Sequence, residues 1–234
     1  TLAALEKEKE LNELRSRFVS MTSHEFRTPL ATILSSAELL KYYGDRLPES
    51  EKLDVIQTIE NSVHRMTRML DRVLLLGKVD AQMLQFEPTS LDLIPLCQSL
   101  VRDAVAQFPN GKCVVEAKLA ADLPKAQYDE KLLRHIFSNL LSNAIKYSPN
   151  GGMVDFDVRH DGSKTIFTVS DQGIGIPAEE ISHLFESFHR ASNVGDIQGT
   201  GLGLAIVKNS VDLHGGDITV HSTVNQGTQF VVRL

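Results

Sequence analysis

The sequence predicts an α+β protein with two parts: an antiparallel helical hairpin, then a two-layer α/β sandwich with a mixed sheet. Two observations predict this fold class. The heptad pattern, with steps of three and four, runs from Ala4 to Thr28 and again from Ile56 to Val73, the period of packed helices. From residue 85 onward, segments with strand-like composition that pair as hairpins alternate with amphipathic helices, which is typical of a sheet with helices on one face.

The first helix is predicted from a heptad pattern that runs from Ala4 to Thr28 and is apolar in its middle. His24 lies beside this seam rather than in it, so its ring is expected to face solvent. Unperturbed imidazole has a pKa of about 6.5 and is a nucleophile when neutral. Glu25 is placed to accept its proton, and Thr28 lies one turn further along the same face. The same pattern also fits a coiled-coil helix with an incidental surface histidine.

A second helix is predicted after the polar break at residues 43–48, and the two helices form a hairpin. Met69 and the run Leu74–Leu76 fall outside a two-helix seam, so one hairpin cannot cover its own apolar surface. A homodimer that forms a four-helix bundle would bury these residues. Packing against the rest of the chain is the alternative, but it would cover His24. The seam of the second helix consists of Ile56, Ile59, Val63, Met66, Leu70 and Val73.

The composition argues against a nucleic-acid-binding protein and against a membrane-spanning segment. The chain has 234 residues and a net charge of −6, and it shows no basic stripe of the kind that binds nucleic acid. It has no run of about 18 uncharged apolar residues, as a membrane-spanning helix requires. Cys97 and Cys113 have neither metal-ligand nor disulfide spacing, which favours a reducing, cytoplasmic compartment. The charged opening from Thr1, without a signal peptide, is expected to be the cut end of a longer protein.

The second part is predicted to contain mixed strands and helices. Asp92 is expected to cap a helix with Pro95 in its first turn. The hairpin strands are expected at 154–159 and 165–170, and the helix over 201–214 is followed by Gly215-Gly216, a helix-ending signal. The remaining elements are expected as a strand at 114–119, helices at 129–147 and late in 176–187, and strands at 218–222 and 229–234.

Asn139, Asn143 and Lys146 fall on one face of the helix predicted over 129–147. Amide oxygens are suitable ligands for Mg²⁺, which retains most of its waters and bridges substrate phosphates. A nearby lysine would neutralise phosphate charge. Polar residues on one helical face are most often a solvated surface, but this helix is apolar over much of its remaining circumference. The pattern therefore favours a lined cavity.

Two glycine-rich segments follow, and both have the composition of nucleotide-binding loops. Asp171 ends a strand and precedes Gly173 and Gly175, so its carboxylate can accept from an exocyclic amine while the backbone passes close to a base. The segment Gly199–Leu204 leads into a helix, whose N-terminus favours phosphate. It is neither a dinucleotide fingerprint, because polar loop precedes it, nor a Walker loop, because no Gly-Lys-Ser/Thr follows.

In this order and spacing, the motifs resemble the catalytic core of a bacterial-type sensor histidine kinase of a two-component system, over essentially the whole chain. The residues around His24 are similar to the phospho-acceptor box of that family, and Asn139–Ser148 to its first ATP-site motif. The resemblance implies a dimerisation and phosphotransfer domain in residues 1–80. It implies an ATP-binding domain in residues 81–234, of the type shared with gyrase and the ninety-kilodalton heat-shock chaperones. The other matching motifs are Asp171–Ile176, Phe185–Phe188, Gly199–Leu204 and Gly227–Phe230.

The resemblance implies an enzyme that uses ATP and Mg²⁺ to phosphorylate His24 and passes the phosphoryl group to an aspartate of a response-regulator receiver domain. Catalytic roles fall to His24, Glu25 and Thr28, the last in dephosphorylating the regulator. Asn143, with Asn139 beside it, would form the Mg²⁺ site. Nucleotide contacts are implied for Asn139, Asn143, Lys146, Tyr147, Asp171, Gly173, Gly175, Ile176, Arg190, Gly199, Thr200, Gly201, Leu202 and Gly203.

Two alternatives remain open on the residues alone. A gyrase-like ATPase would share the nucleotide site, although such enzymes commonly carry a catalytic glutamate where this chain has Asn139. A nucleotide-sensing dimerisation module would show the same motifs without catalysis. The expected partners are a second copy of the chain and a response regulator. The resemblance also implies an N-terminal sensor module, which can be membrane-attached, and a full-length protein at the inner face of the cell membrane.

Overall fold

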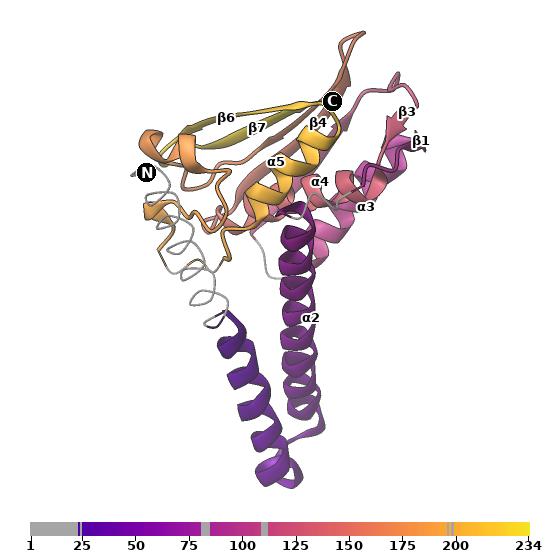
Figure 1. The fold of residues 1–234 in the computed structure, drawn as a ribbon. Coiled ribbons are helices and arrows are strands. Elements are labelled where there is room, and N and C mark those ends of the chain that lie inside the picture. Colours follow the sequence, from indigo (N-terminus) through magenta and orange to yellow (C-terminus); the bar gives the residue numbers. More distant parts are fainter. Residues whose placement is uncertain (1–22, 24, 81–84, 109–111, 196, 198) are drawn as a thin grey trace, which may run out of the picture. The chain divides into compact units, whose positions relative to one another are not determined.

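The computed structural model describes residues 23, 25–80, 85–108, 112–195, 197 and 199–234. It divides into two compact units that meet between Gly77 and Lys78. Helices build the first unit, and a sheet with helices on one face builds the second (Figure 1). This confirms the predicted α+β class. Within the described ranges, no helix combines the length and apolar character needed to cross a membrane.

The first unit is a helical hairpin. Residues 25–43 are helical, the 3-10 turn η1 spans Gly44–Arg46, and helix α2 spans Glu49–Asp80. Leu47 is extended because a proline follows it and restricts the backbone of the residue before it. The break between the helices thus lies within the predicted segment 43–48. The heptad residues up to Met21, and His24 itself, lie outside the described residues.

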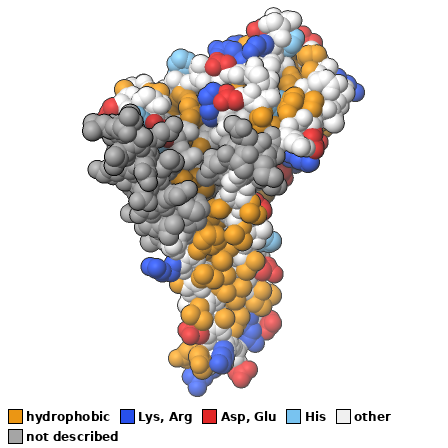
Figure 2. Space-filling view, viewed as in Figure 1, with side chains coloured by type: hydrophobic (Ala, Val, Ile, Leu, Met, Phe, Trp, Pro, Cys, Tyr) orange, Lys and Arg blue, Asp and Glu red, His pale blue; other side chains and the backbone are white. Residues whose placement is uncertain are grey.

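One face of the hairpin is packed and another is open. The expectation for Met69 is wrong: it is 5% exposed in the single chain, not left outside the packed face. Ser62 is 9% exposed, and Ile59, Met66 and Val73 are half-buried. Every second position of the predicted seam is instead open to solvent. Figure 2 shows hydrophobic side chains gathered along the hairpin. A single hairpin therefore leaves a long apolar surface uncovered, with exposures of 43–64% at Leu30, Leu34, Leu53, Ile56, Val63, Leu70 and Leu74.

The second unit is built on a five-stranded mixed sheet. Its strand order is β2-β4-β5-β7-β6, and the β2–β4 pair is parallel while the other pairs are antiparallel. Alternate residues of β4, among them Val154, Phe156 and Val158, are buried on the helix-covered face, as strand geometry requires. The strands are β2 (Cys113–Leu119), β4 (Gly152–His160), β5 (Thr165–Ser170), β6 (Asp217–Thr223) and β7 (Gly227–Arg233).

Three helices, α3 (Leu93–Ala106), α4 (Glu130–Lys146) and α5 (Gly203–Leu213), cover one face of this sheet (Figure 1). Asp92 caps α3 as predicted, because its Oδ1 accepts a hydrogen bond from Ile94 N at 3.1 Å. Asp129 caps α4 in the same way through Leu132 N.

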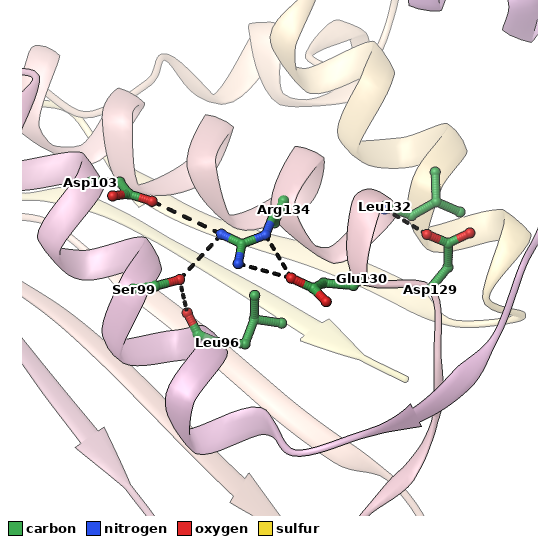
Figure 3. A network of polar contacts seen from close by, with 7 residues as sticks. All are labelled: Leu96, Ser99, Asp103, Asp129, Glu130, Leu132 and Arg134. Atoms are coloured by element: carbon green, nitrogen blue, oxygen red, sulfur yellow. Dashed lines mark hydrogen bonds and ion pairs between the residues drawn. The ribbon is translucent and has the colours of Figure 1, made fainter.

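Polar contacts join α3 to α4 on the outer surface (Figure 3). The Arg134 guanidinium donates to Glu130 Oε1 at 2.9 Å on its own helix and to Ser99 Oγ at 3.2 Å on α3. Ser99 in turn donates to the Leu96 carbonyl at 2.9 Å. The charged side chains are partly exposed, so their ion pairs add little stability.

The chain enters the second unit through an anchored segment. Glu87 N donates to Asp129 Oδ2 at 2.9 Å, and the Phe86 ring lies edge-on to His214, with ring centroids 4.9 Å apart. His214 at the end of α5 accepts from Asp129 N at 3.2 Å, and burial lowers its pKa. Strand β1 (Thr89–Leu91) then pairs with β3 (Ala126–Tyr128), a strand that the sequence did not predict.

Two predicted helix boundaries are wrong. The segment expected to become a helix late in 176–187 forms only a 3-10 helix, η2 (Ala178–His183). Helix α5 begins at Gly203 rather than at Gly201, because Gly201 has a φ of +67°, which a right-handed helix does not allow. A further 3-10 turn, η3 (Ser192–Val194), precedes the second glycine-rich segment.

Candidate nucleotide-binding and phospho-acceptor sites

The start of α5 lies against the asparagine face of α4. Asn139 is 7% exposed, and its Nδ2 donates to the His135 carbonyl at 2.7 Å. Its Oδ1 faces Gly203, where a side-chain carbon would lie only 2.9 Å from that oxygen. The contact brings a helix N-terminus, whose first N–H groups have no partner within the helix, next to Asn139, one of the two residues predicted for the Mg²⁺ site.

Lys146 and Tyr147, at the end of α4, face the second glycine-rich segment. Lys146 Nζ lies 4.0 Å from the centroid of the Tyr147 ring. A side-chain carbon at Gly199 would lie 3.0 Å from that Nζ and 3.5 Å from the Tyr147 hydroxyl. Burial raises the pKa of Tyr147, and the positive charge of Arg190 opposes this shift. The cations Lys146 and Arg190 and the phenol of Tyr147 therefore lie close together, beside Gly199, where the absence of a side chain allows a phosphate to approach.

Asp171 is held by backbone N–H groups at the end of β5. Its Oδ1 accepts from Gly173 N at 2.8 Å and from Thr228 N at 3.2 Å. Burial raises the pKa of this carboxyl group, and the two N–H donors oppose that rise. Within the described ranges no hydrogen bond reaches Oδ2, so one oxygen is free to accept from an exocyclic amine.

The loop after Asp171 is formed by close backbone packing. A side-chain carbon at Gly175, whose φ is +65°, would lie 2.0 Å from the Thr223 carbonyl oxygen. One at Gly227 would lie 1.9 Å from the carbonyl oxygen of Asp171. Ile174 N donates to the Tyr147 carbonyl at 3.0 Å, which ties the loop to the end of α4. The shape of this loop therefore depends on residues without side chains.

Two hydroxyl groups behind the loop were not singled out by the sequence. Ile176 N donates to Ser222 Oγ at 2.9 Å, and this oxygen lies 2.9 Å from Thr228 Oγ1. Thr228 is 7% exposed and its backbone N–H binds Asp171. The Gly227–Phe230 motif was the available signal for Thr228, but Ser222 has none, because its contact is set by the pairing of β6 with β7.

The residues before the second glycine-rich segment contact both glycine loops. Phe188 N donates to the Gly201 carbonyl at 3.0 Å, and Leu202 N donates to Thr200 Oγ1 at 3.4 Å. Asn193 Nδ2 donates to the Gly175 carbonyl at 2.9 Å. Arg190 donates to the Ile197 carbonyl. The structure thus brings predicted residues of α4 and of both glycine loops together around one site. Nucleotide contact by these residues, Arg190 included, stays a prediction.

The predicted phospho-acceptor region lies in the first unit. Arg65 of α2 donates through Nη2 to Glu25 Oε2 at 3.2 Å, and the Glu25 side chain is 12% exposed. Thr28 is exposed. His24 lies outside the described residues, so its predicted role rests on its place in the sequence, directly before Glu25.

Comparisons with known proteins define the class. Residues 14–82 match the His Kinase A (phospho-acceptor) domain, and residues 128–234 match the histidine kinase-, DNA gyrase B- and HSP90-like ATPase domain. The chain belongs to the sensor histidine kinase family and comprises its catalytic core.

Several curated relatives align over almost the whole chain. Drug sensory protein A of Synechocystis sp. is 34% identical over 98% of the chain, and sensor histidine kinase WalK of Bacillus subtilis is 32% identical over 97%. The alginate biosynthesis sensor protein KinB of Pseudomonas aeruginosa is 31% identical over 94%. The chain spans only 36–38% of the length of these three relatives.

Solved structures agree with the fold. Full-length ShkA in complex with AMPPNP superposes with a TM-score of 0.65 at 28% identity, covering 92% of this chain and 44% of that one. The histidine kinase AdeS of Acinetobacter baumannii gives a TM-score of 0.67 at 21% identity, covering 90% and 96%, which supports the fold alone.

Proposed function

We propose that this chain is an ATP-dependent protein-histidine kinase that phosphorylates its own His24 and passes the phosphoryl group to an aspartate of a response-regulator receiver domain. The observation that carries the proposal is that one chain matches a phospho-acceptor domain over 14–82, which includes His24, and an ATPase-type domain over 128–234. A gyrase-like ATPase lacks the first of these, and a module without catalysis would not need an acceptor histidine. The phosphotransfer role is assigned to residues 1–80 and ATP binding to 81–234.

Nucleotide binding is assigned to the site on the second unit. Asp171 Oδ2 would accept the adenine amine, and the loop of Gly173, Gly175 and Ile176 would approach the base. Lys146 and Tyr147 would meet the phosphates or ribose beside Gly199. The phosphates would lie beside the start of α5, in contact with Thr200, Gly201, Leu202 and Gly203, and with Arg190 nearby. This positioning and charge neutralisation supply the catalysis.

Mg²⁺ fits Asn143 better than Asn139. Asn143 is half-exposed, and no hydrogen bond to its side chain occurs in the described part of the chain, so its amide oxygen is free. Asn139 Oδ1 faces Gly203 instead, which suits a role beside the metal. One amide ligand is enough, because Mg²⁺ keeps waters and binds the phosphates of the nucleotide. When bound, the ion would neutralise charge on the phosphates.

The test is the detection of phosphohistidine after incubation with labelled ATP and Mg²⁺. The label should be acid-labile and alkali-stable, and His24→Gln should abolish it, because this change removes the nucleophile and keeps a polar side chain. His64→Gln, on the exposed surface of α2, is the matched control and should label normally. Label that persists in His24→Gln and maps to another histidine would refute the assignment.

We also propose that the first unit dephosphorylates the regulator. The hydroxyl of exposed Thr28 would hold a water in line with the phosphoaspartate, a positioning role that needs no charge. Thr28→Ala should therefore retain autophosphorylation and lose dephosphorylation, whereas Glu25→Ala should do the reverse. A phosphate-release time course with a phosphorylated cognate regulator measures this. Release by Thr28→Ala at the unmodified rate would show that the hydroxyl has no part in it.

The phospho-acceptor domain implies dimerisation, and the family implies a response-regulator partner. We further propose that the chain forms a homodimer through the open face of the hairpin and that its chemistry takes place in the cytoplasm. We also propose that the full-length protein has an N-terminal sensor module, which can hold it at the inner face of the membrane. The basis for the homodimer is the uncovered apolar surface of α2.

A further inference from the structure

The geometry points to Arg65 as a positioning residue that holds the carboxylate of Glu25 in place to receive the proton of His24. The inference rests on the proposed function. The observation behind it is the hydrogen bond from Arg65 Nη2 to Glu25 Oε2 at 3.2 Å, which joins the two helices of the hairpin between residues 40 positions apart.

Arg65 lies on the face of α2 that packs against the first helix. Ser62 and Met69, three positions before it and four positions after it, are 9% and 5% exposed and share this face. The side chain of Arg65 is 36% exposed, and its guanidinium reaches Glu25 on the other helix. Arg68, three positions further on, is exposed.

Glu25 is the more buried partner, with its side chain 12% exposed. A carboxylate so far removed from water requires a partner, and a guanidinium supplies one. Only Oε2 takes part in this pair, and no other hydrogen bond to the Glu25 side chain occurs in the described part of the hairpin. Oε1 therefore remains as an acceptor on the residue next to His24.

A fixed acceptor matters for the reaction. When a ring nitrogen of His24 attacks the γ-phosphorus of ATP, a nitrogen–phosphorus bond forms, the bond to the leaving ADP oxygen breaks, and the ring must release the proton of its other nitrogen. Glu25 Oε1 would take this proton and then return it to solvent. A free glutamate samples several rotamers, so a partner that selects one of them raises the fraction of encounters with the base in reach.

The test compares variants of the whole chain with ATP and Mg²⁺. Arg65→Ala should lower the maximal rate of autophosphorylation tenfold or more and leave the KM for ATP within twofold, because the nucleotide site lies on the other unit. Arg65→Lys should recover part of the rate, since it restores the charge without the planar fork. Arg68→Ala removes the same charge from the same helix and should stay within twofold of the unmodified rate.

A double variant separates positioning from a structural bridge. If Arg65 acts through Glu25, then Arg65→Ala combined with Glu25→Gln should be no slower than Glu25→Gln alone. Additive losses, or a rate for Arg65→Ala equal to that of Arg68→Ala, would overturn the positioning role. A fall in melting temperature that tracks the loss of rate in both Arg65 variants would also overturn it. Absence of phosphohistidine in the unmodified chain would overturn the proposed function, on which this role depends.

Discussion

Asp171 shows which contacts of a single residue come from its neighbours in sequence and which come from distant parts of the fold. Its place at the end of a strand and before Gly173 is visible in the sequence, and in the structure Gly173 N donates to its carboxylate. Its second donor, Thr228 N, comes from a strand 57 residues away. Contacts of this kind depend on which elements pack together, and local patterns do not determine that. The pair of Glu25 with Arg65, between two helices, was unforeseen for the same reason.

Replacing Asp171 should identify the base that the site accepts. Asp171→Ala removes the carboxylate oxygen that we assign to the adenine amine, so ATP should bind about tenfold more weakly or worse, as expected for a lost hydrogen bond to a charged group. The preference for ATP over GTP should fall with it. Calorimetric titration measures both affinities.

Asp122→Ala provides the control for that measurement, because Asp122 is exposed on the same unit. It should bind ATP as the unmodified chain does. Unchanged affinity in Asp171→Ala would place the base elsewhere in the site.

At the scale of elements, the long segments were predictable and the short ones were not. The α4 helix, the β4–β5 hairpin and the cap at Asp92 are confirmed, because periodicity and capping act within a few residues. Strand β3 was missed because its three residues carry too little pattern and their conformation depends on pairing with β1. The 3-10 character of η2 was missed because the choice between helix types depends on packing rather than on composition.

The first glycine loop allows a test of steric packing apart from backbone strain. Gly175 and Gly162 both have positive φ, +65° and +92°, but only Gly175 has a neighbour within 4 Å of a built side-chain carbon. Gly162→Ala should therefore lose only about 1–3 kcal/mol of stability, the usual range for such strain. Gly175→Ala should lose more and bind ATP poorly, because the Thr223 carbonyl must move.

Urea denaturation and ATP titration of the two variants check this expectation. Equal effects of the two substitutions would show that backbone strain alone governs the loop and that its close packing against β6 is unimportant.

At the scale of the whole molecule, the predicted fold class, a helical part followed by a mixed α/β sheet part, is confirmed, and the chain divides into two compact units after Gly77. The predicted seam of α2 could not say which of its positions face the neighbouring helix of the same chain. The structure separates them: Ile59, Met66 and Val73 are half-buried, and Ile56, Val63 and Leu70 are open. Periodicity identifies the apolar face of α2, but only the packed hairpin shows which residues of that face remain exposed.

The open face should mediate the dimer. Val63→Asp would bury an unpaired charge in the four-helix bundle, at a cost of about 3–5 kcal/mol, and should shift the chain toward monomer. Val105→Asp is a close match, because Val105 is 48% exposed on α3 and Val63 is 47% exposed on α2. It should leave the dimer intact. Sedimentation at micromolar concentration distinguishes these results; a monomeric unmodified chain would contradict the assignment.

The open face of the hairpin has a consequence for a cell that holds several kinases of this kind. Its exposed members on α2, such as Leu53, Ile56 and Leu74, are aliphatic, and aliphatic surfaces discriminate weakly between similar partners. Mixed pairs between paralogous kinases would join signalling routes that should stay separate. Insulation between paralogues must therefore come from features that disfavour the wrong partner, such as charges beside the apolar stripe. In the proposed dimer, the open face would supply adhesion and the charges beside it would decide the choice of partner.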